Sequence, residues 1–382
     1  MIDRRPTTPL PRTVLMTTDT LGGVWQYSME LAHGLAAEGV QVLLATLGSV
    51  PSRAQYAEAG TVRGLELHAG PYKLPWMAEP WREVAAGGEW LLGLAQSSRP
   101  DLVHLSEPVY GALPWRVPTV AVGHSCVLSW WDAVWGEPAP PSWERYHREM
   151  ATGLAAADAV VAPTRAMLIA LRTHYDIRRG MVIHNGRASA PFRPSVKRPM
   201  VLTAGRIWDP AKNVLALDQA AEHLAWPVYA AGELQSPDGS SPPTMPRHLR
   251  LLGKVSASEV ATWTSHAAIY ALPARYEPFG LSVLEAALAG CALVLGDIAS
   301  LRELWDGVAV FVPPDQPDTL RSALDALIRD SALREALAMR ARRRALGLSR
   351  ERMTGEYLDL YGQMLAGAVT GPEPAEVSAC AS

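Results

Sequence analysis

Two glutamates, Glu277 and Glu285, are separated by seven residues that include a Pro-Phe-Gly turn. The apolar run at 268–272 predicts a β-strand before the turn, and the apolar residues after it predict a helix ending at Gly290. The turn therefore presents free backbone N–H groups at a helix N-terminus, which is a favourable position for a phosphate group. Carboxylates accept hydrogen bonds from hydroxyls. Together these features predict a ligand with both a diphosphate and sugar hydroxyls, which describes a nucleotide sugar.

A second interpretation of the same residues needs no ligand. Ser282 precedes Glu285 by three positions, which is the spacing of a capping box, and such a box alone would account for Glu285. Glu277 would then be a solvated residue of the turn. The residues by themselves leave both interpretations open.

The segment 277–285 resembles the E-x7-E motif of the retaining family-4 glycosyltransferases, the glycosyl transferases of group 1, which have the GT-B fold. In that family the first glutamate contacts hydroxyls of the donor sugar and the second holds the ribose. The resemblance implies these roles for Glu277 and Glu285. The amides between the two glutamates contact the diphosphate, and in this chain they belong to Phe279, Gly280 and Leu281.

Two basic residues, Arg206 and Lys212, follow a predicted strand at 200–203. Arg offers a planar fork of donors and Lys a mobile point charge, a combination that suits a diphosphate, although such residues in loops are usually only solvated. They match the family pattern G-R-x(n)-K, which implies that both stabilise the departing nucleoside diphosphate. The segment 251–256 resembles a family segment whose backbone reads the base, which implies donor binding by Val255.

A glycine pair, Gly22-Gly23, follows the first predicted strand at 13–17 and precedes a helical pattern. Strand, glycine turn and helix in this order are typical of the start of a doubly wound α/β domain. The chain has no G-x-G-x-x-G dinucleotide fingerprint at this turn. The family has a similar Gly-Gly-Val loop beside the donor phosphate and the acceptor, and the resemblance therefore implies that this pair contacts the donor.

His124 follows another short apolar strand at 119–122, and the resemblance implies that it lies close to the donor sugar. The residues around it are close to the G-x-S-x-G elbow of serine hydrolases, with Ser125 in the nucleophile position. Val127, however, occupies the place of the second glycine that the sharp turn needs, which disfavours a hydrolase. A purely structural histidine at a loop edge stays open as an alternative.

Nine of the 13 tryptophans lie in the first half of the chain, so some of them must belong to a core. Trp130, Trp131 and Trp135 differ from the others because three prolines follow them at 138–141. Indoles combine an apolar face with one polar N–H group. We expect these three to form a loop platform that receives an apolar or sugar acceptor.

The chain length of 382 residues and a hydrophobic content of 48% suffice for two domains with substantial cores. The resemblance implies an α/β, GT-B architecture, in which two Rossmann-like domains face each other across a cleft and a C-terminal helix crosses back. The predicted division is a disordered N-terminus (1–12), an acceptor-side domain (13–190), a Pro-rich linker (191–199), a nucleotide-sugar domain (200–351), the crossover helix (352–366) and a disordered tail (367–382).

Charge and composition exclude several classes of partner. The formal net charge of −3 gives no overall attraction to nucleic acid. The three cysteines lack metal-binding spacing and predict a reduced, cytoplasmic compartment. The first residues do not read as a signal peptide, and no apolar run reaches the ~20 residues of a membrane span.

Six arginines near the C-terminus form a basic cluster, for which a solvated helix face is favoured over a peripheral contact with anionic lipid. They are Arg340, Arg342, Arg343, Arg344, Arg350 and Arg352. The sequence also contains no Asp-x-Asp pair, the pattern that holds a metal ion in many glycosyl transfers. We therefore expect neither a metal nor a cofactor besides the donor.

The reaction implied by the resemblance is transfer of a hexosyl group from a nucleotide-diphosphate sugar to an acceptor hydroxyl, with retention of anomeric configuration. A protein of the same fold that binds nucleotide sugars without transferring them, as an inactive module or an epimerase, is the alternative. An epimerase would use the donor cleft without an acceptor, so product analysis separates the two. The donor sugar, its base and the acceptor are not specified by the residues.

Overall fold

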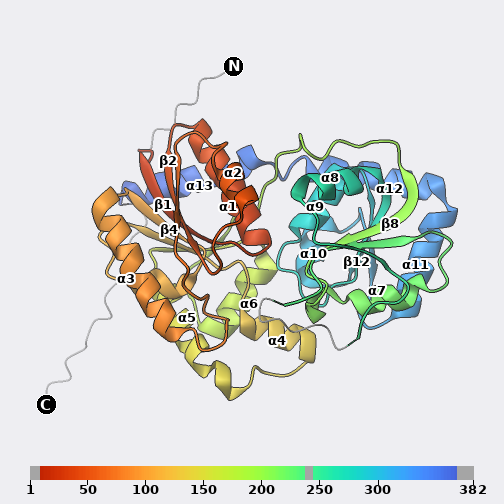
Figure 1. Ribbon diagram of the computed structural model, residues 1–382, viewed down its shortest axis with the longest axis horizontal. Helices are drawn as coiled ribbons and strands as arrows, with labels where there is room; N and C mark the ends of the chain where they lie inside the picture. The colour runs from red at the N-terminus through yellow and green to blue at the C-terminus, as the bar shows by residue number, and fades with distance from the viewer. Residues whose placement is uncertain (1–8, 237–243, 368–382) are drawn as a thin grey trace, which may run out of the picture.

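The structure is a computed structural model that describes residues 9–236 and 244–367. These residues form two α/β domains, each built on a parallel sheet with helices packed around it (Figure 1). The predicted GT-B architecture is confirmed. The expected disorder of the N-terminus and of the tail concerns mostly residues 1–8 and 368–382, which lie outside the described residues.

The first domain contains a seven-stranded sheet of order β3-β2-β1-β4-β5-β6-β7, in which all neighbours are parallel. The strands are β1 (Thr13–Asp19), β2 (Gln41–Leu47), β3 (Leu65–Ala69), β4 (Leu102–Leu105), β5 (Thr119–Val122), β6 (Ala159–Ala162) and β7 (Met181–Val182). The helices are α1 (Gly23–Ala37), α2 (Arg53–Ala59), α3 (Trp81–Ser98), α4 (Val127–Trp135), α5 (Glu144–Ala156) and α6 (Arg165–Tyr175). The strand order reverses between β1 and β4, and ligands of such sheets bind at the carboxyl ends beside this reversal.

The second domain contains a six-stranded parallel sheet of order β10-β9-β8-β11-β12-β13. Its strands are β8 (Arg198–Ala204), β9 (Val228–Ala231), β10 (Arg250–Gly253), β11 (Ala267–Leu272), β12 (Ala292–Gly296) and β13 (Val310–Val312). Its helices are α7 (Val214–Ala221), α8 (Ala257–His266), α9 (Leu281–Leu288), α10 (Ala299–Trp305), α11 (Pro317–Arg329) and α12 (Ser331–Ala345). Here the order reverses between β8 and β11, so the loops after these two strands meet at one edge.

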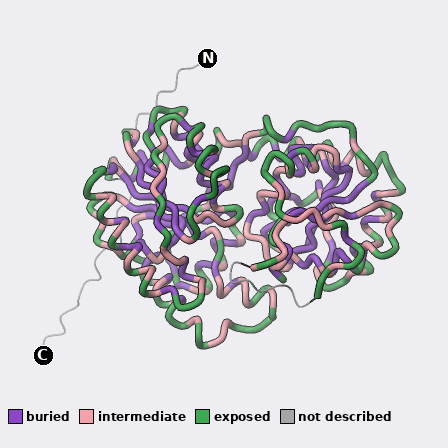
Figure 2. The backbone as a smooth tube through the Cα atoms, viewed as in Figure 1, coloured by how far each residue is buried: buried purple, intermediate pink, exposed green. Residues whose placement is uncertain are grey.

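The central strands of both sheets are buried, whereas the outer segments are mostly exposed (Figure 2). Every residue of β11 and of β12 is buried. Strands covered on both faces read as continuous apolar runs, which is why these segments could be predicted from the sequence.

The last helix, α13 (Arg350–Leu365), returns from the second domain and packs against α1 of the first. The two helices approach closely at Gly34, where a Cβ atom would lie 1.8 Å from the Thr354 hydroxyl oxygen. The Tyr361 hydroxyl lies 2.7 Å from His104 Nδ1 in the core of the first domain. The expected crossover is therefore present and is tied to the first domain by a buried hydrogen bond.

Two parts of the first domain differ from the sequence prediction. Between β2 and residue 82 the sequence has no regular apolar pattern and predicts a less regular region, whereas the structure has α2 and the edge strand β3 there. The tryptophan platform was expected in a loop, and that prediction is wrong because Trp130, Trp131 and Trp135 lie on α4. The Cys126 sulfur accepts from the Ser129 N–H at the start of α4, and Gly136 ends it with a φ of 70° before the prolines begin.

Candidate active site

The carboxyl ends of the two sheets face a cleft of about 1060 Å³ that both domains line. The predicted site residues that line it are Gly22, Gly23, His124, Trp130, Trp131, Arg206, Lys212, Glu277, Phe279 and Leu281. Four other predicted residues do not line it in the described part of the chain, namely Val255, Gly280, Glu285 and Trp135. The Gly22-Gly23 pair, which precedes α1, is also close to the second domain, since a Cβ on Gly23 would be 3.6 Å from the Leu281 side chain.

Glu277 and Lys212 form an ion pair in the wall of the cleft. Lys212 Nζ donates to Glu277 Oε2 over 2.6 Å, and each side chain is 13% exposed. Lys212 ends a short 3-10 helix after β8, whereas Glu277 lies in the loop after β11, so the neighbouring strands bring them together. The pair leaves a cation and a carboxylate at one point of the cleft, as a diphosphate and a sugar hydroxyl would require.

The backbone after Glu277 turns sharply into α9. Glu277 Oε1 accepts from the Gly280 N–H over 3.0 Å, and Gly280 precedes the helix with a φ of 86°, which favours glycine. Because α9 begins at Leu281, Ser282 lies inside the helix and is not its N-cap. The capping-box interpretation is therefore wrong. The N-terminus of α9 opens between Phe279 and Leu281, both of which line the cleft.

Arg206 lies beside Asp209 in the same wall. Arg206 Nη2 is 2.9 Å from Asp209 Oδ2, and the guanidinium stacks at 5.4 Å from the centre of the Trp208 ring. Asp209 is 3% exposed and also accepts from the Ala211 N–H and the Trp130 indole N–H. The carboxylate thus fixes the base of the loop and leaves the Arg206 side chain 45% exposed toward solvent and ligand.

Glu285 has a partner that sequence analysis missed. Arg187 Nε donates to Glu285 Oε1 over 2.8 Å, and Arg187 Nη1 donates to Glu30 Oε1 over 2.7 Å. Arg350 of α13 donates to the second oxygen of Glu30 over 2.5 Å. The network joins α1, the segment after β7, α9 and α13 in a buried position. Burial raises the pKa of Glu285, and the charge of Arg187 opposes that rise.

His124 faces the cleft from the first domain, at the end of β5. Its Nε2 is 3.4 Å from the Ser106 hydroxyl, and its ring packs edge-on against Tyr27 with centroids 4.4 Å apart. Burial lowers the pKa of His124 to about 3, so the ring is neutral near pH 7. A buried layer lies behind it, in which the Tyr27 hydroxyl is 3.0 Å from Nε2 of His104. This layer holds the His124 ring in place.

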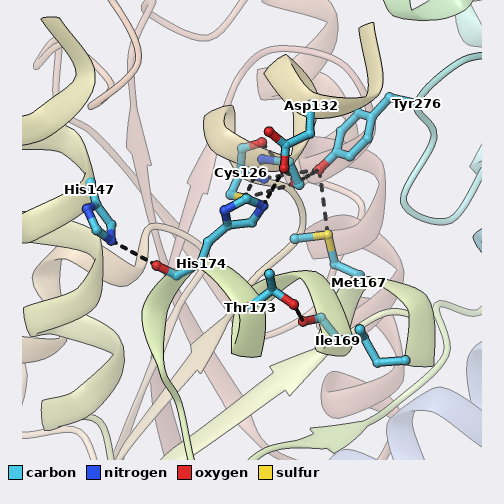
Figure 3. A network of polar contacts seen from close by, with 9 residues as sticks. Cys126, Asp132, His147, Met167, Ile169, Thr173, His174 and Tyr276 are labelled. Carbon is cyan, nitrogen blue, oxygen red and sulfur yellow. Dashed lines mark hydrogen bonds and ion pairs between the residues drawn. The ribbon is translucent and has the colours of Figure 1, made fainter. Parts of the chain in front are cut away.

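Tyr276 connects the two walls of the cleft. It comes from the loop after β11, and its hydroxyl accepts from the Cys126 N–H over 3.2 Å and lies 2.9 Å from the Ser129 hydroxyl. Figure 3 shows this hydroxyl pointing among Cys126 and Met167 of the first domain, whereas Asp132 pairs with His174 beside it. The contact fixes the start of α4 against the loop that carries Glu277.

Trp130, Trp131 and Trp135 form one aromatic cluster, with ring centroids 5.9 to 6.2 Å apart. Trp130 and Trp131 line the cleft, whereas Trp135 is 54% exposed and lies outside it. Val255, at the end of the loop before α8, packs half-buried against the core of the second domain. Trp130 and Trp131 can therefore contact a ligand in the cleft, whereas Trp135 and Val255 lie away from it.

The basic cluster is partly engaged within the fold. Arg342 donates to the Leu288 carbonyl over 3.1 Å, and Arg344 donates to the Asp306 carbonyl over 2.6 Å. Arg350 belongs to the buried network described above. None of the helices in the described part of the chain is both long and apolar enough to cross a bilayer.

Two carboxylates at the cleft were also missed by sequence analysis. Asp19 ends β1 and Glu107 follows β4 by two residues, and both line the cleft on the side of the first domain. The signal that could have found them is their position after neighbouring strands at the reversal of strand order. Nothing in the local sequence around either residue distinguishes it from a solvated carboxylate.

Comparison with known proteins matches each domain to a family model. Residues 21–188 match Glycosyltransferase Family 4, and residues 198–330 match Glycosyl transferases group 1. The chain belongs to the group 1 glycosyltransferases. It is a glycosyltransferase with the GT-B fold.

The relatives include D-inositol 3-phosphate glycosyltransferases. One from Streptomyces bingchenggensis is 26% identical over 92% of this chain and 86% of its own length. One from Nocardioides sp. is 28% identical over 90% of this chain and 86% of its own length. Sequence similarity therefore extends across both domains of this glycosyltransferase.

Solved structures share the fold at lower identity. Sucrose-phosphate synthase from Thermosynechococcus elongatus has a TM-score of 0.78 at 18% identity and covers 93% of this chain and 100% of its own. Alr3699/HepE from Anabaena, in complex with UDP-glucose, has a TM-score of 0.72 at 16% identity and covers 91% of this chain and 98% of its own. At these identities the likeness concerns the fold alone.

Proposed function

We propose that this glycosyltransferase moves a hexosyl group from a nucleotide-diphosphate sugar to an acceptor hydroxyl with retention of anomeric configuration. The observation that carries the proposal is the convergence of Lys212, Arg206, Glu277 and the N-terminus of α9 on one wall of the cleft. Two cations and a helix N-terminus suit a diphosphate, and a carboxylate suits sugar hydroxyls. The solved relative with UDP-glucose supports this class of donor.

Lys212 and Arg206 would stabilise the leaving group in this reaction. The bond between the anomeric carbon and the diphosphate oxygen breaks, and the departing nucleoside diphosphate gains negative charge that both cations offset. The acceptor oxygen bonds to the anomeric carbon from the same face, and its proton passes to the departing diphosphate. The neutral ring of His124 lies across the cleft, where it can contact the sugar without adding charge.

Glu277 and Glu285 would hold hydroxyls of the donor. Glu277 is ready for this role at the cleft, where Lys212 orients it. Glu285 lies behind the wall on Arg187, so ribose binding there requires the loop before α9 or the Arg187 side chain to shift. Val255 also lies away from the cleft, so contacts between its backbone and the base of the donor would likewise require a local shift.

We further propose that the transfer needs no metal ion. In the described residues no three side chains of His, Cys, Asp or Glu are grouped so that they could hold one. Protein cations and a helix N-terminus can offset the charge of a diphosphate without a metal. The rate of transfer should be the same with excess chelator and with added Mg²⁺ or Mn²⁺, and complete, reversible loss on chelation would contradict this part of the proposal.

The donor can be found with a panel of UDP-, GDP- and ADP-linked sugars. A nucleotide sugar that binds the native state raises the midpoint of thermal unfolding by mass action. The wild-type chain should respond to at least one of them, and Lys212→Ala should lose most of that response. Product analysis then distinguishes transfer from epimerisation, because an epimerase changes the sugar of the donor and forms no glycoside.

A further inference from the structure

The side of the cleft lined by the first domain is called the acceptor half. It contains two carboxylates, Asp19 and Glu107, that have no role in the donor binding proposed above. Strand β1 pairs with β4 in a register that includes Met16 opposite His104. The same register, extended three residues toward the carboxyl ends, brings Asp19 opposite Glu107. Both residues line the cleft, and the Gly22-Gly23 loop follows Asp19 directly. The charge of Asp19 also raises the pKa of Glu107, which places the two carboxyl groups near each other in this half of the cleft.

Glu107 lacks a partner for one of its oxygens. The residue is 7% exposed, and its Oε2 atom is buried without a hydrogen-bond partner among the described residues. Asp19 accepts one hydrogen bond at Oδ1, from the Leu21 N–H over 2.8 Å. A buried polar atom without a partner costs free energy, and a ligand that donates a hydrogen bond to it recovers that cost. The carboxylate is thus positioned for a donor group from outside the chain.

The charges around this pair disfavour an anionic ligand. Of the first-domain residues that line the cleft in the described part of the chain, Lys73 has the only full positive charge. Its ammonium group is already 3.1 Å from the Ala78 carbonyl and 3.5 Å from Glu83. Arg206 reaches toward Asp19 from the opposite wall, where it serves the donor. A phosphate in the acceptor half would face two carboxyl groups without a free cation beside them.

Aromatic side chains complete this half of the cleft. Trp76, Trp130, Trp131 and Trp143 all line it. An indole presents a broad apolar face, which suits the C–H face of a sugar or cyclitol ring, whereas carboxyl oxygens suit the hydroxyls at its edge. Indole faces beside hydroxyl acceptors, with no free cation among the first-domain residues that line the described cleft, suit an uncharged, hydroxyl-rich ring.

We propose that the acceptor of this glycosyltransferase is an uncharged sugar, glycoside or cyclitol, and that Glu107 and Asp19 bind its hydroxyls and exclude phosphorylated acceptors. This inference rests on the proposed glycosyl transfer and adds the class of acceptor to it. It separates this chain from its relatives that are D-inositol 3-phosphate glycosyltransferases. One acceptor hydroxyl takes the hexosyl group and gives its proton to the departing diphosphate, and the others are held by the two carboxyl groups.

The test uses acceptors in matched pairs, with the nucleotide sugar that thermal unfolding identifies as the donor. The pairs are myo-inositol with D-inositol 3-phosphate, and glucose with glucose 6-phosphate. The assays are run at pH 9, where both carboxyl groups are ionised, since burial gives Asp19 a pKa of about 7 and Glu107 a pKa of about 8. Because like charges placed together cost several kcal/mol, kcat/KM for an uncharged acceptor should exceed that for its phosphate by about 100-fold at this pH. Equal or better transfer to the phosphorylated members would overturn the inference and leave the proposed transfer intact.

Variants show whether the carboxyl groups cause the discrimination. At pH 9 Glu107→Gln keeps the shape of the side chain and removes its charge, so it should raise KM for the uncharged acceptor and reduce the preference over the phosphate at least about tenfold. Glu89→Gln, the same change on the exposed face of α3, should alter neither. Donor affinity, measured by the shift in the thermal unfolding midpoint, should be unchanged in Glu107→Gln and in Glu89→Gln. This result would also show that both variants are folded.

A second variant, Asp19→Asn, covers the case in which Glu107→Gln does not fold, and it should reduce the same preference. Unchanged discrimination in whichever of the two variants folds would overturn the inference. If no nucleotide sugar binds and no glycoside forms with any acceptor, the proposed function itself fails, which is a different result from transfer to the wrong member of a pair.

Discussion

The two walls of the cleft, one from each domain, differ in how their charged side chains are paired. In the second domain each charged side chain at the cleft has an opposite charge within 3 Å, as in the pairs Lys212–Glu277 and Arg206–Asp209. In the first domain Asp19 and Glu107 are placed together without such a partner among the described residues. The paired wall is organised before the donor arrives, whereas the unpaired wall is completed by hydroxyls of the acceptor.

The largest effect is expected at Arg187, which joins both domains through Glu30 and Glu285. Arg187→Met would leave Glu285 buried without its cation and would leave Glu30 with Arg350 alone, and breaking such a buried pair costs about 3–5 kcal/mol. Urea unfolding should show a loss of this size. Arg302→Met removes exposed ion pairs with Asp297 and Asp306 and should lower stability much less than Arg187→Met. Similar losses for the two variants would mean that the network does not connect the domains.

The next effect concerns the donor wall. Lys212→Ala or Arg206→Ala should lower kcat by roughly 2–4 kcal/mol of transition-state stabilisation, because each cation offsets charge that grows on the leaving diphosphate. The control is Arg321→Ala, which removes a guanidinium group on α11 that pairs with Asp318 and does not line the cleft. Steady-state rates with the donor at saturation measure the difference. Unchanged turnover in both cleft variants would contradict the proposal that Lys212 and Arg206 bind the diphosphate.

The acceptor wall predicts a dependence of stability on pH. Burial raises the pKa of Asp19 to about 7 and, together with repulsion from Asp19, that of Glu107 to about 8. The folded state therefore keeps protons that the unfolded chain loses near pH 4. The stability from this pair is fully present below that pH and is lost as pH rises through 7 and 8, at about 1.4 kcal/mol per unit for each retained proton.

Thermal unfolding of the wild type and of the double variant Asp19→Asn/Glu107→Gln from pH 5 to pH 9 tests this dependence. Amides do not titrate, so the midpoint of the variant should fall less over this range than that of the wild type. Parallel curves for the two proteins would show that the pair does not retain protons in the folded state.

The smallest effect separates two neighbouring tryptophans of α4. Trp131 lines the cleft and Trp135 is mostly exposed outside it. Trp131→Ala should raise the KM for the acceptor by about 1–2 kcal/mol of lost stacking, with donor affinity unchanged, whereas Trp135→Ala should leave both near the wild-type values. Acceptor titrations at saturating donor measure this split. An equal loss for both variants would make the whole cluster, and not the cleft face, the acceptor surface.

The sequence predicts those parts of the site whose structure is determined by residues close together in the chain. The strand, turn and helix around Glu277 are legible because β11 is wholly apolar and α9 begins directly after a glycine turn. The same reasoning fails for α4, since the prolines that suggested a loop begin only after Gly136 has ended the helix. It also fails for β3, an edge strand whose residues are half-exposed and do not form an apolar run.

Contacts between distant segments were beyond the sequence. Arg187 and Glu285 are 98 residues apart and meet only because the two domains pack together. No local sequence pattern predicts this pair. Asp19 and Glu107 come together through the register of β1 and β4, which the spacing of two short apolar runs does not reveal. The motifs therefore indicate the donor wall, whereas the acceptor wall depends on tertiary structure.

The anomeric configuration of the product tests the central claim most directly. The wild-type chain is incubated with the nucleotide sugar that stabilises it and with the uncharged acceptors named above, and the new glycosidic bond is assigned by NMR. We expect a glycoside with the anomeric configuration of the donor, formed much more slowly when Lys212 is replaced by Ala. A glycoside of inverted configuration, or an epimerised donor without any glycoside, would contradict it.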